Sequence, residues 1–403
     1  MALLPVDEAL ARLLDGAEPH GSEDVPLADA AGRVLAENVI ARRTQPPFEA
    51  SAMDGYAVRA QDIASVPARL ALIGMAAAGH GFHGAVGAGQ AVRIFTGAPL
   101  PQGADTIAIQ ENVASLGDRN VEVRQSEPVG RHIRQRGLDF AKGDVLLEAG
   151  RTLDAGALSL AAAGNHASLP VLKRPLVAII ATGDELVPPG AEPEPDQIVA
   201  SNNVGVAAVV REAGGEVLDL GIAPDRKEEI DRLLRQASEA GAQLVVTIGG
   251  ASVGDHDLVQ AVLREAGMAL DFWKIAMRPG KPLMFGRLGG MRCVGLPGNP
   301  VASLVCGHVF LKPLVARLAG RPHETLMREA VLGAAMAAND TRQDYVRASA
   351  ERTEKGLVAT PFPIQDSSML RFFAAADALI VRPPFAPAAE AGERCPVLML
   401  KPA

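Results

Sequence analysis

Hydrophobic and polar positions follow their clearest pattern between residues 175 and 320. The apolar runs that predict buried strands lie at 176–181, 216–222, 244–248 and 270–276. The amphipathic stretches that predict helices between them end near Gly214-Gly215 or span 227–240 and 257–266. Continuous apolar strands that alternate with helices are typical of a parallel sheet covered on both faces. We therefore predict a doubly wound α/β domain in this part of the chain.

The regions on either side follow different patterns. A short amphipathic helix is predicted near the N-terminus, where Pro5 and Gly16 bracket the helically spaced Val6, Ala9, Leu10, Leu13 and Leu14. Between residues 60 and 130, β-rich runs such as 91–95 and 121–123 are separated by glycine-rich turns, which predicts a small sheet domain. After Pro322 the helical signal ends and prolines divide the tail into short extended segments, which predicts a small β domain.

Composition excludes several classes of protein. The 403 residues are 48% hydrophobic and 21% charged, as in a globular protein rather than a disordered one. A net charge of −8 and only 3% aromatic residues argue against a nucleic-acid-binding surface, so no nucleic-acid partner is expected. Cys293, Cys306 and Cys395 have no metal-ligand or redox spacing. No signal peptide and no apolar window of roughly 20 residues is evident, so we expect a cytoplasmic protein without a membrane span.

Candidate chemistry gathers where the predicted parallel strands end. In a doubly wound sheet, ligands bind at the carboxyl ends of the strands. The loops that follow the predicted strands carry glycines, carboxylates and cations. These loops are 181–185, the loop with Asp225, 249–257, 278–282 and 297–300. No nucleophile elbow, Walker A loop or dinucleotide fingerprint is present, which disfavours covalent catalysis and nicotinamide chemistry.

These loops have the residue types that bind phosphate through a metal. Gly249, Gly250 and Gly254 let backbone N–H groups approach an anion, and Ser252 adds a hydroxyl donor. Pro300 suits a first helical turn, which places Gly298 and Asn299 at a helix N-terminus. Arg278 and Lys281 supply positive charge for an oxyanion. The carboxylates beside these loops predict a bridging divalent cation, Mg²⁺, with Glu185, Asp225 and Asp257 as its ligands.

Structural explanations remain open for several of these residues. A glycine-rich turn between a strand and a helix can be purely structural. Asp257 can serve only as a helix N-cap, Asp255 is a stronger candidate for that role, and His256 is expected to be solvated. Arg278 or Lys281 can instead pair with a nearby carboxylate on the surface.

Further motifs extend the pattern over most of the chain. They are Ser51-Ala52-Met53-Asp54-Gly55-Tyr56-Ala57, the segment 95–105, Ile133-Arg134-Gln135-Arg136-Gly137-Leu138-Asp139, the segment 342–347 and Gln365-Asp366-Ser367-Ser368. Together with the sheet-edge loops, these motifs resemble the molybdopterin molybdenumtransferase family of molybdenum-cofactor biosynthesis, which is related to the C-terminal domain of gephyrin. Few other families combine these motifs in this order.

The resemblance implies a multidomain α/β fold. The expected domains are a discontinuous linker domain over 1–43 plus 140–172, an inserted β-rich domain over 44–139, the α/β molybdopterin-binding domain over 173–323, and a C-terminal small β-barrel over 324–403. Members are homodimers in which the active cleft is completed by the second domain of the partner subunit. That arrangement would bring Asp54 and Asp139 towards the loops at the sheet edge.

The resemblance also implies the activity. A Mg²⁺-dependent transferase accepts adenylylated molybdopterin and molybdate, inserts molybdenum into the dithiolene and releases AMP. The residues expected to be catalytic are Asp54, Asp139, Glu185, Asp225 and Asp257. The residues expected to bind substrate are Thr182, Gly183, Gly249, Gly250, Ser252, Arg278, Lys281, Pro282, Gly298, Asn299, Arg347, Ser367 and Ser368. Other molybdenum-cofactor biosynthesis proteins are candidate partners.

This chain departs from the family pattern at three positions. Arg278 stands where the family commonly has Lys, Ala251 replaces a usual Val, and Asp366 occupies a position that is often Gly. The negative charge of Asp366 puts the oxyanion-binding role of Ser367 and Ser368 in question. Two other functions stay open, namely a molybdopterin adenylyltransferase that uses ATP and a non-catalytic scaffold like gephyrin.

Overall fold

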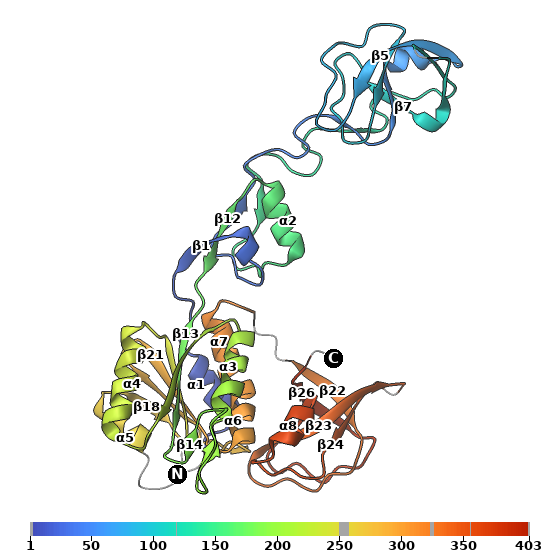
Figure 1. Cartoon of the computed structure of the whole chain (residues 1–403). Coiled ribbons are helices and arrows are strands. Elements are labelled where there is room, and N and C mark those ends of the chain that lie inside the picture. The colour runs from blue at the N-terminus through green and yellow to red at the C-terminus, as the bar shows by residue number, and fades with distance from the viewer. Residues whose placement is uncertain (1–2, 118, 250–257, 323–325, 355, 402–403) are drawn as a thin grey trace. The chain divides into compact units, whose positions relative to one another are not determined.

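The computed structural model describes residues 3–117, 119–249, 258–322, 326–354 and 356–401 of the chain. The chain divides into two compact units (Figure 1). Unit 1 contains Met1–Glu23 and Leu172–Ala403, and unit 2 contains Asp24–Val171.

Unit 1 contains the predicted α/β domain. Its six-stranded sheet has the order β16-β13-β17-β21-β20-β18. The strands are β13 (Leu176–Thr182), β16 (Glu216–Ala223), β17 (Leu244–Ile248), β18 (Ala269–Phe272), β20 (Met284–Leu288) and β21 (Met291–Leu296). Strands β16, β13, β17 and β21 are parallel, whereas β20 runs antiparallel to both of its neighbours. The hairpin of β20 and β21 was not among the predicted strands.

Helices cover both faces of this sheet, as the apolar patterns predict (Figure 1). The helices are α3 (Asn202–Glu212), α4 (Lys227–Glu239), α5 (Leu258–Glu265), α6 (Pro300–Cys306) and α7 (Lys312–Leu318). One hydrophobic core joins the sheet to α3, α6 and α7, and a second joins its other face to α4 and α5. Each parallel strand therefore buries apolar side chains on both faces, which explains why the strands appear in the sequence as continuous apolar runs.

The helical run Pro300–Leu318 corrects one expectation. It comprises α6, the π-helical segment Gly307–Leu311 and α7, and its 19 residues are long and apolar enough to span a membrane. The expectation that no window approaches this length is therefore wrong. However, 78% of its apolar window is buried inside the protein, as in a core helix.

The N-terminal helix α1 (Val6–Leu14) has the predicted bounds but packs with the α/β domain. Val6, Ala9 and Leu13 are buried in the same core as α7. Residues 1–23 accordingly belong to unit 1 rather than to the rest of the segment 1–43. The apolar face of the helix predicts that it is buried, but not which domain covers it.

The tail of unit 1 forms the predicted small barrel. Its strands are β22 (Met327–Leu332), β23 (Gln343–Thr353), β24 (Gly356–Pro361), β25 (Ala378–Arg382) and β26 (Arg394–Met399), and a short helix, α8 (Leu370–Ala375), precedes β25. The order β23-β24-β22-β26-β25 closes because β25 also pairs with β23. A two-residue strand from the α/β domain, β19 (Met277–Arg278), adds to β23 in parallel.

Unit 2 contains a small core built from two distant segments of the chain. Val25, Leu35 and Val39 pack with Leu147 and Leu169 in one hydrophobic cluster. The elements here are β1 (Ser22–Pro26), β2 (Val39–Ile40), β11 (Val145–Leu147), α2 (Ala155–Ala163) and β12 (Ser168–Leu172). This cluster joins residues from the two segments that the resemblance assigns to one discontinuous domain.

The rest of unit 2 is β-rich, as predicted. A six-stranded sheet has the order β7-β4-β6-β5-β9-β8. Its strands are β4 (Gly55–Val58), β5 (Ala68–Ala76), β6 (Gln90–Ile94), β7 (Thr106–Ile109), β8 (Val113–Ser115) and β9 (Asn120–Val123). A separate pair is formed by β3 (Ala50–Ser51) and β10 (Ile133–Arg134), which carry parts of two of the motifs.

Candidate functional site

A recess of about 110 Å³ lies at the carboxyl edge of the α/β sheet. Thr182 at the end of β13, Gly249 after β17 and Gly298 before α6 line it, together with Glu185. The structure thus brings together four residues that the sequence predicts at this edge. Their loops follow neighbouring strands of one sheet, as expected for a doubly wound domain.

Two glycines allow these loops to approach each other. Gly249 has φ = 96°, and a Cβ there would lie 2.6 Å from the Thr182 carbonyl oxygen. Gly183 has φ = 146°, and a Cβ there would lie 2.3 Å from Glu185 Oε2. Any other residue would meet backbone or carboxylate atoms at these positions. Close packing against the Thr182 backbone therefore requires glycine at position 249, whether or not a ligand is bound, and the positive φ favours glycine at position 183.

Three carboxylates gather at the end of β13 and β16. The Asp225 backbone N–H donates a hydrogen bond to Asp184 Oδ1 at 3.0 Å. Burial, followed by the negative charges of Asp184 and Glu185, raises the pKa of Asp225. Mutual repulsion of this kind is relieved by a cation, so the charge pattern here is compatible with a divalent metal ion.

The metal ligands predicted from the sequence are only partly described. Glu185 and Asp225 lie near each other, as their electrostatic coupling shows. Asp257, Gly250 and Ser252 fall in the stretch 250–257, outside the described residues. Within the described part of the chain, no group of three or more His, Cys, Asp and Glu is arranged to hold a metal ion.

The loop before α6 connects the sheet edge to the barrel. Asn299 Nδ2 donates a hydrogen bond to Ser367 Oγ at 2.9 Å, and the Val301 N–H donates to the Ser367 carbonyl oxygen at 3.0 Å. On the other side, Asn202 Nδ2 donates to the Gly298 carbonyl oxygen at 2.7 Å. Gly298, Asn299 and Ser367, all three expected to bind substrate, therefore lie close together.

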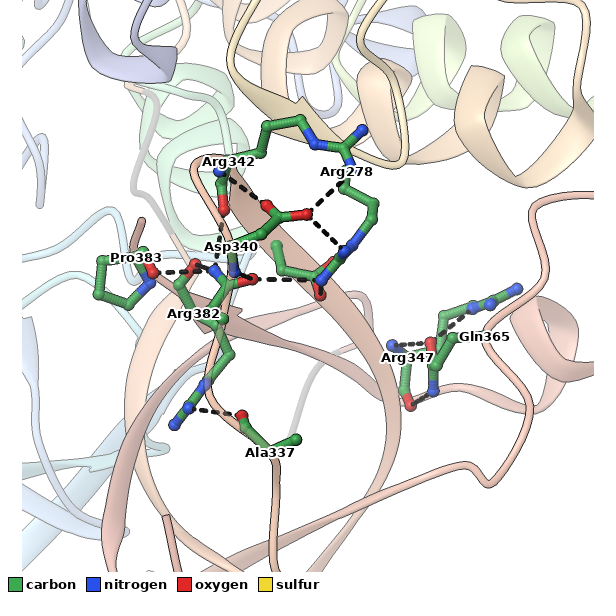
Figure 2. A network of polar contacts seen from close by, with 10 residues as sticks. Arg278, Ala337, Asp340, Arg342, Arg347, Gln365, Arg382 and Pro383 are labelled. Atoms are coloured by element: carbon green, nitrogen blue, oxygen red, sulfur yellow. Dashed lines mark hydrogen bonds and ion pairs between the residues drawn. The ribbon is translucent and has the colours of Figure 1, made fainter. Parts of the chain in front are cut away.

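Arg347 is a buried cation beside the Ser367 loop. It is 1% exposed, and burial lowers the pKa of its guanidinium. Its Nε donates to Gln365 Oε1 at 3.1 Å (Figure 2). Its Nη1 donates to the Asp366 carbonyl oxygen at 2.7 Å. These two acceptors are uncharged, although the negative charges of Asp366 and Asp344 also act on the guanidinium. Arg347 is thus a buried cation whose described hydrogen bonds go to neutral acceptors of this loop.

Ser368 has its donors occupied by a neighbour. Its Oγ and its backbone N–H both donate to Asp366 Oδ1, at 2.6 and 2.8 Å. These two hydrogen bonds hold the pKa of Asp366 below its ordinary value. An ionised carboxylate therefore takes the donors that an oxyanion would need, which adds to the doubt that the sequence raises about this loop.

Arg278 is bound to the barrel. Its guanidinium donates to Asp340 Oδ2 at 2.9 Å, Asn339 Oδ1 at 3.1 Å and Asp344 Oδ2 at 2.5 Å. Figure 2 shows Asp340 between Arg278 and Arg342, which is also paired with it at 3.1 Å. The hydrogen bond with Asp344 is the largest influence that raises the Arg278 pKa. Arg278 therefore pairs with nearby carboxylates, which is the alternative to oxyanion binding that the sequence left open for Arg278 or Lys281.

Lys281 differs from Arg278 in its surroundings. Gly280 has φ = 114°, and a Cβ there would lie 2.5 Å from Cys306 Sγ, so the loop packs closely on α6. In the part of the chain that the structure describes, no acidic side chain pairs with Lys281. The loop thus presents one neutralised cation and, at Lys281, an unpaired one. Pro282 follows directly in this loop, and its side chain has no polar group to contribute.

Two predicted carboxylates lie in unit 2. Asp54 Oδ1 accepts hydrogen bonds from the Thr96 N–H and Oγ1, both at 2.8 Å. These bonds lower the pKa of Asp54, so the carboxylate is ionised at neutral pH. Asp139 is exposed, and its backbone N–H donates to the Gln45 carbonyl oxygen at 3.0 Å.

Some residues at these sites were not predicted from the sequence. Asn202 and Asn203 line the recess beside Ser201 at the start of α3. Asp184 belongs to the acidic group, and Thr96 binds Asp54. Ser201, Asn202 and Asn203 form a run of small polar residues at the start of an apolar helix. Such a run is a sequence signal that could have identified the residues beside the recess.

Family models match almost the whole chain in three segments. Residues 4–164 match the MoeA N-terminal region (domain I and II), and residues 178–317 match a probable molybdopterin binding domain. Residues 329–400 match the MoeA C-terminal region (domain IV).

Curated relatives carry one name. A protein from Haemophilus influenzae named molybdopterin molybdenumtransferase is 38% identical, over 79% of this chain and 78% of that protein. A protein of the same name from Bacillus subtilis is 35% identical, over 99% of this chain and 94% of that protein. A protein from Mycobacterium tuberculosis, named molybdopterin molybdenumtransferase 2, is 37% identical over 88% and 89%.

Solved structures agree with this match over the full length. A molybdopterin biosynthesis moeA protein from Pyrococcus horikoshii has a TM-score of 0.86 at 30% identity and covers 100% of both chains. A second structure of such a protein from that organism has a TM-score of 0.80 at 27% identity, over 99% of this chain and 100% of that one. This chain therefore belongs to the molybdopterin molybdenumtransferase family.

Proposed function

We propose that the protein inserts molybdenum from molybdate into adenylylated molybdopterin and releases AMP. The observation that carries the proposal is the recess at the sheet edge, where Thr182, Glu185, Gly249 and Gly298 meet. Backbone N–H groups of glycine loops and helix N-termini bind phosphate, as a nucleotide-linked substrate requires. The relatives' common name supports the same conclusion.

Molybdate would bind between the barrel and the start of α6. Arg347 supplies a buried positive charge, and Asn299 and Ser367 supply polar groups beside it. Lys281, for which no acidic partner is found among the described residues, would add a second cation. A tetrahedral dianion is stabilised by cationic and hydroxyl donors of this kind, especially where water is partly excluded.

The sulfur ligands of molybdenum would come from the substrate. The three cysteines are free and buried, and burial raises the pKa of Cys293 to about 12. A protonated, buried thiol is a poor metal ligand. The chain therefore has no thiolate to compete with the dithiolene. Free cysteines are also typical of a reducing compartment, and on this ground we place the protein in the cytoplasm.

Mg²⁺ is the proposed cofactor, held by Glu185 and Asp225 together with Asp257. When bound, it would neutralise phosphate charge and orient the leaving phosphate. The raised pKa of Asp225 supports a cation at this place, since the repulsion among Asp184, Glu185 and Asp225 favours any group that neutralises it.

A homodimer is proposed because the predicted carboxylates are divided between the two units. Asp54 is ionised and Asp139 is exposed in unit 2, whereas the recess lies in unit 1.

The test is reconstitution with purified protein, adenylylated molybdopterin, molybdate and Mg²⁺. The proposal predicts molybdenum cofactor and AMP in equal amounts. A second reaction supplies ATP and molybdopterin without the adenylylated substrate. Turnover in that reaction, with none in the first, would instead establish the adenylyltransferase alternative. Absence of turnover in both would favour a scaffold.

A further inference from the structure

A hollow on the surface of unit 2 gathers three cations. It has a volume of about 410 Å³ and is lined by Arg43, Arg136 and Lys142, together with Thr44, Pro47 and Asn165. We call it the basic pocket. None of these residues lines the recess in unit 1, and none of the described acidic side chains lines the pocket. Every titratable group of its lining is therefore positively charged at neutral pH.

Hydrogen bonds hold the walls of the basic pocket together. The Gln45 N–H donates to the Phe140 carbonyl oxygen at 2.9 Å. The Lys142 N–H donates to Thr44 Oγ1 at 3.1 Å. The two segments that carry Arg43 and Lys142 are thus fixed side by side, so the cations come together without a ligand. A site that is formed before binding loses little conformational entropy when the ligand arrives.

Arg136 is oriented by a contact with the backbone. Its Nε donates to the Pro47 carbonyl oxygen at 3.1 Å, which fixes the direction of the guanidinium. No described residue accepts from its Nη groups, so both can contact a phosphate in the bidentate way that arginine favours. Arg131 in the same segment differs, because its guanidinium lies 3.8 Å from Glu127.

The end of α2 beside the pocket needs no cation for its hydrogen bonds. Free carbonyl groups at a helix C-terminus can attract positive side chains. Here the carbonyl oxygens of residues 160–162 and of Gly164 each accept a backbone N–H. Arg43 and Lys142 are exposed and have no ion-pair partner among the described residues. Like charges held in one hollow repel one another, and an anion would relieve that repulsion.

We propose that the basic pocket binds the phosphate groups of a diphosphate or triphosphate. A single phosphate fills only a small part of the hollow, whereas two or three linked phosphates can contact Arg43, Arg136 and Lys142 together. Thr44 and Asn165 add a hydroxyl and an amide donor. None of the described aromatic side chains lines the pocket, so it recognises phosphates rather than a base.

The test is calorimetric titration of the full-length protein with pyrophosphate, ADP and AMP in the absence of Mg²⁺. Arg43→Gln and Lys142→Gln should each weaken pyrophosphate binding by about 5- to 20-fold, as expected for loss of a charged hydrogen-bond donor. The triple variant that also carries Arg136→Gln should bind one pyrophosphate fewer per chain than the wild type. This difference separates the pocket from any phosphate bound at the recess. ADP should bind the pocket as tightly as pyrophosphate, and AMP about tenfold more weakly or less, because it has one phosphate.

Arg42→Gln is the matched control. Arg42 is exposed and adjacent to Arg43, but it does not line the basic pocket. The substitution removes the same charge, so pyrophosphate affinity should change by less than about twofold. An equal loss in this control would show a general effect of charge and would overturn the proposal.

Two further results would also overturn it, namely a wild type that binds no pyrophosphate and pocket variants that bind it unchanged. Melting curves verify that each variant is folded. Arg43→Gln and Lys142→Gln alter different segments of the chain, so if one does not fold the other still decides.

Turnover identifies the source of the phosphates. A raised KM for adenylylated molybdopterin in Lys142→Gln, together with weakened pyrophosphate binding, means that the pocket holds the diphosphate of that substrate. An unchanged KM with weakened pyrophosphate binding means that it holds a separate di- or triphosphate. The titrations require no turnover, so a protein that inserts no molybdenum contradicts the proposed function and leaves this inference to the binding data.

Discussion

Arg278 Nη2 lies 2.5 Å from Asp344 Oδ2, so a side chain of the α/β domain is paired with a strand of the barrel. The backbone follows the same path, since β19 pairs in parallel with Gln343 and Asp344 of β23. A guanidinium that already has two carboxylate partners has little charge left for a free oxyanion. In this chain the residue is therefore expected to hold the barrel in place.

Arg278→Ala should lower the free energy of unfolding by about 1–2 kcal/mol, because it leaves a partly buried carboxylate without its partner. The molybdate concentration needed for half-maximal insertion should change less than in Lys281→Ala. The second variant removes the unpaired cation, and its half-maximal concentration should rise by about 10- to 100-fold. Denaturant titration and molybdate titration of both variants provide the two measurements.

The control for stability is Arg394→Ala in the same barrel. Arg394 pairs with Glu329, but the two side chains are 78% and 63% exposed, so the loss should be about 0–0.5 kcal/mol. The prediction is contradicted if Arg278→Ala is as stable as this control but needs a much higher molybdate concentration for half-maximal insertion. That result would mean that Arg278 binds the oxyanion.

Asp366→Gly should improve the response to molybdate. The substitution removes a negative charge and releases the N–H and Oγ of Ser368, both of which Asp366 now occupies. The half-maximal molybdate concentration is expected to fall by about 2- to 10-fold. Asp366→Asn removes the charge but keeps an acceptor for Ser368, so its effect should be smaller. A higher concentration in both variants would mean that the carboxylate assists the reaction.

The sequence predicts three of the four parallel strands, β13, β16 and β17, because buried strands are continuous apolar runs with helices between them. β13 and β17 begin at their predicted residues and end within one residue of them. The hairpin of β20 and the parallel β21 is missed, and a pattern of apolar residues also does not contain the direction in which a strand runs. The location of α1 is missed for a similar reason, because its apolar face carries no information about the domain that covers it.

The part of the candidate site that follows from the order of strands in the sheet could be predicted from the sequence. Gly183, Gly249 and Gly298 follow strands of one sheet, so topology alone brings them together. The partner of Arg278 was not predictable, because Asp344 lies 66 residues away in another domain and only the tertiary structure brings the two side chains together.

The acidic group predicts a specific pH dependence. Asp225 has a pKa raised above its ordinary 3.8 by burial and by its acidic neighbours, so its charged form is disfavoured in the folded protein. The resulting destabilisation is present above the folded-state pKa and disappears as the pH falls towards and below 3.8. Asp225→Asn should therefore raise the melting temperature at pH 7, and this gain should shrink in acid.

Mg²⁺ gives the same variant a second readout. Added Mg²⁺ should raise the melting temperature of the wild type at pH 7, because the ion binds the folded carboxylates, and chelation should reverse the effect. The increment should be much smaller in Asp225→Asn, and molybdenum insertion should fall. An equal response of wild type and variant to Mg²⁺ would exclude Asp225 as a ligand.

The last prediction concerns subunit complementation. If each cleft combines unit 1 of one chain with unit 2 of its partner, Asp54→Ala and Glu185→Ala homodimers should both be inactive. Mixing them with subunit exchange should restore activity, because every heterodimer has one cleft with both carboxylates intact. Random exchange makes half of the dimers heterodimers with one of two clefts intact, so about a quarter of the wild-type activity is expected.

The matched control mixes Glu185→Ala with a chain that carries both Asp54→Ala and Glu185→Ala. No cleft then contains Glu185, so exchange should restore nothing. Exchange itself is verified with two different affinity tags. If each cleft is instead formed within a single chain, that chain supplies both carboxylates to its own site. Every cleft of the first mixture then lacks either Asp54 or Glu185, and no activity is recovered. Verified heterodimers without recovered activity would therefore place Asp54 and Glu185 in the same chain's cleft.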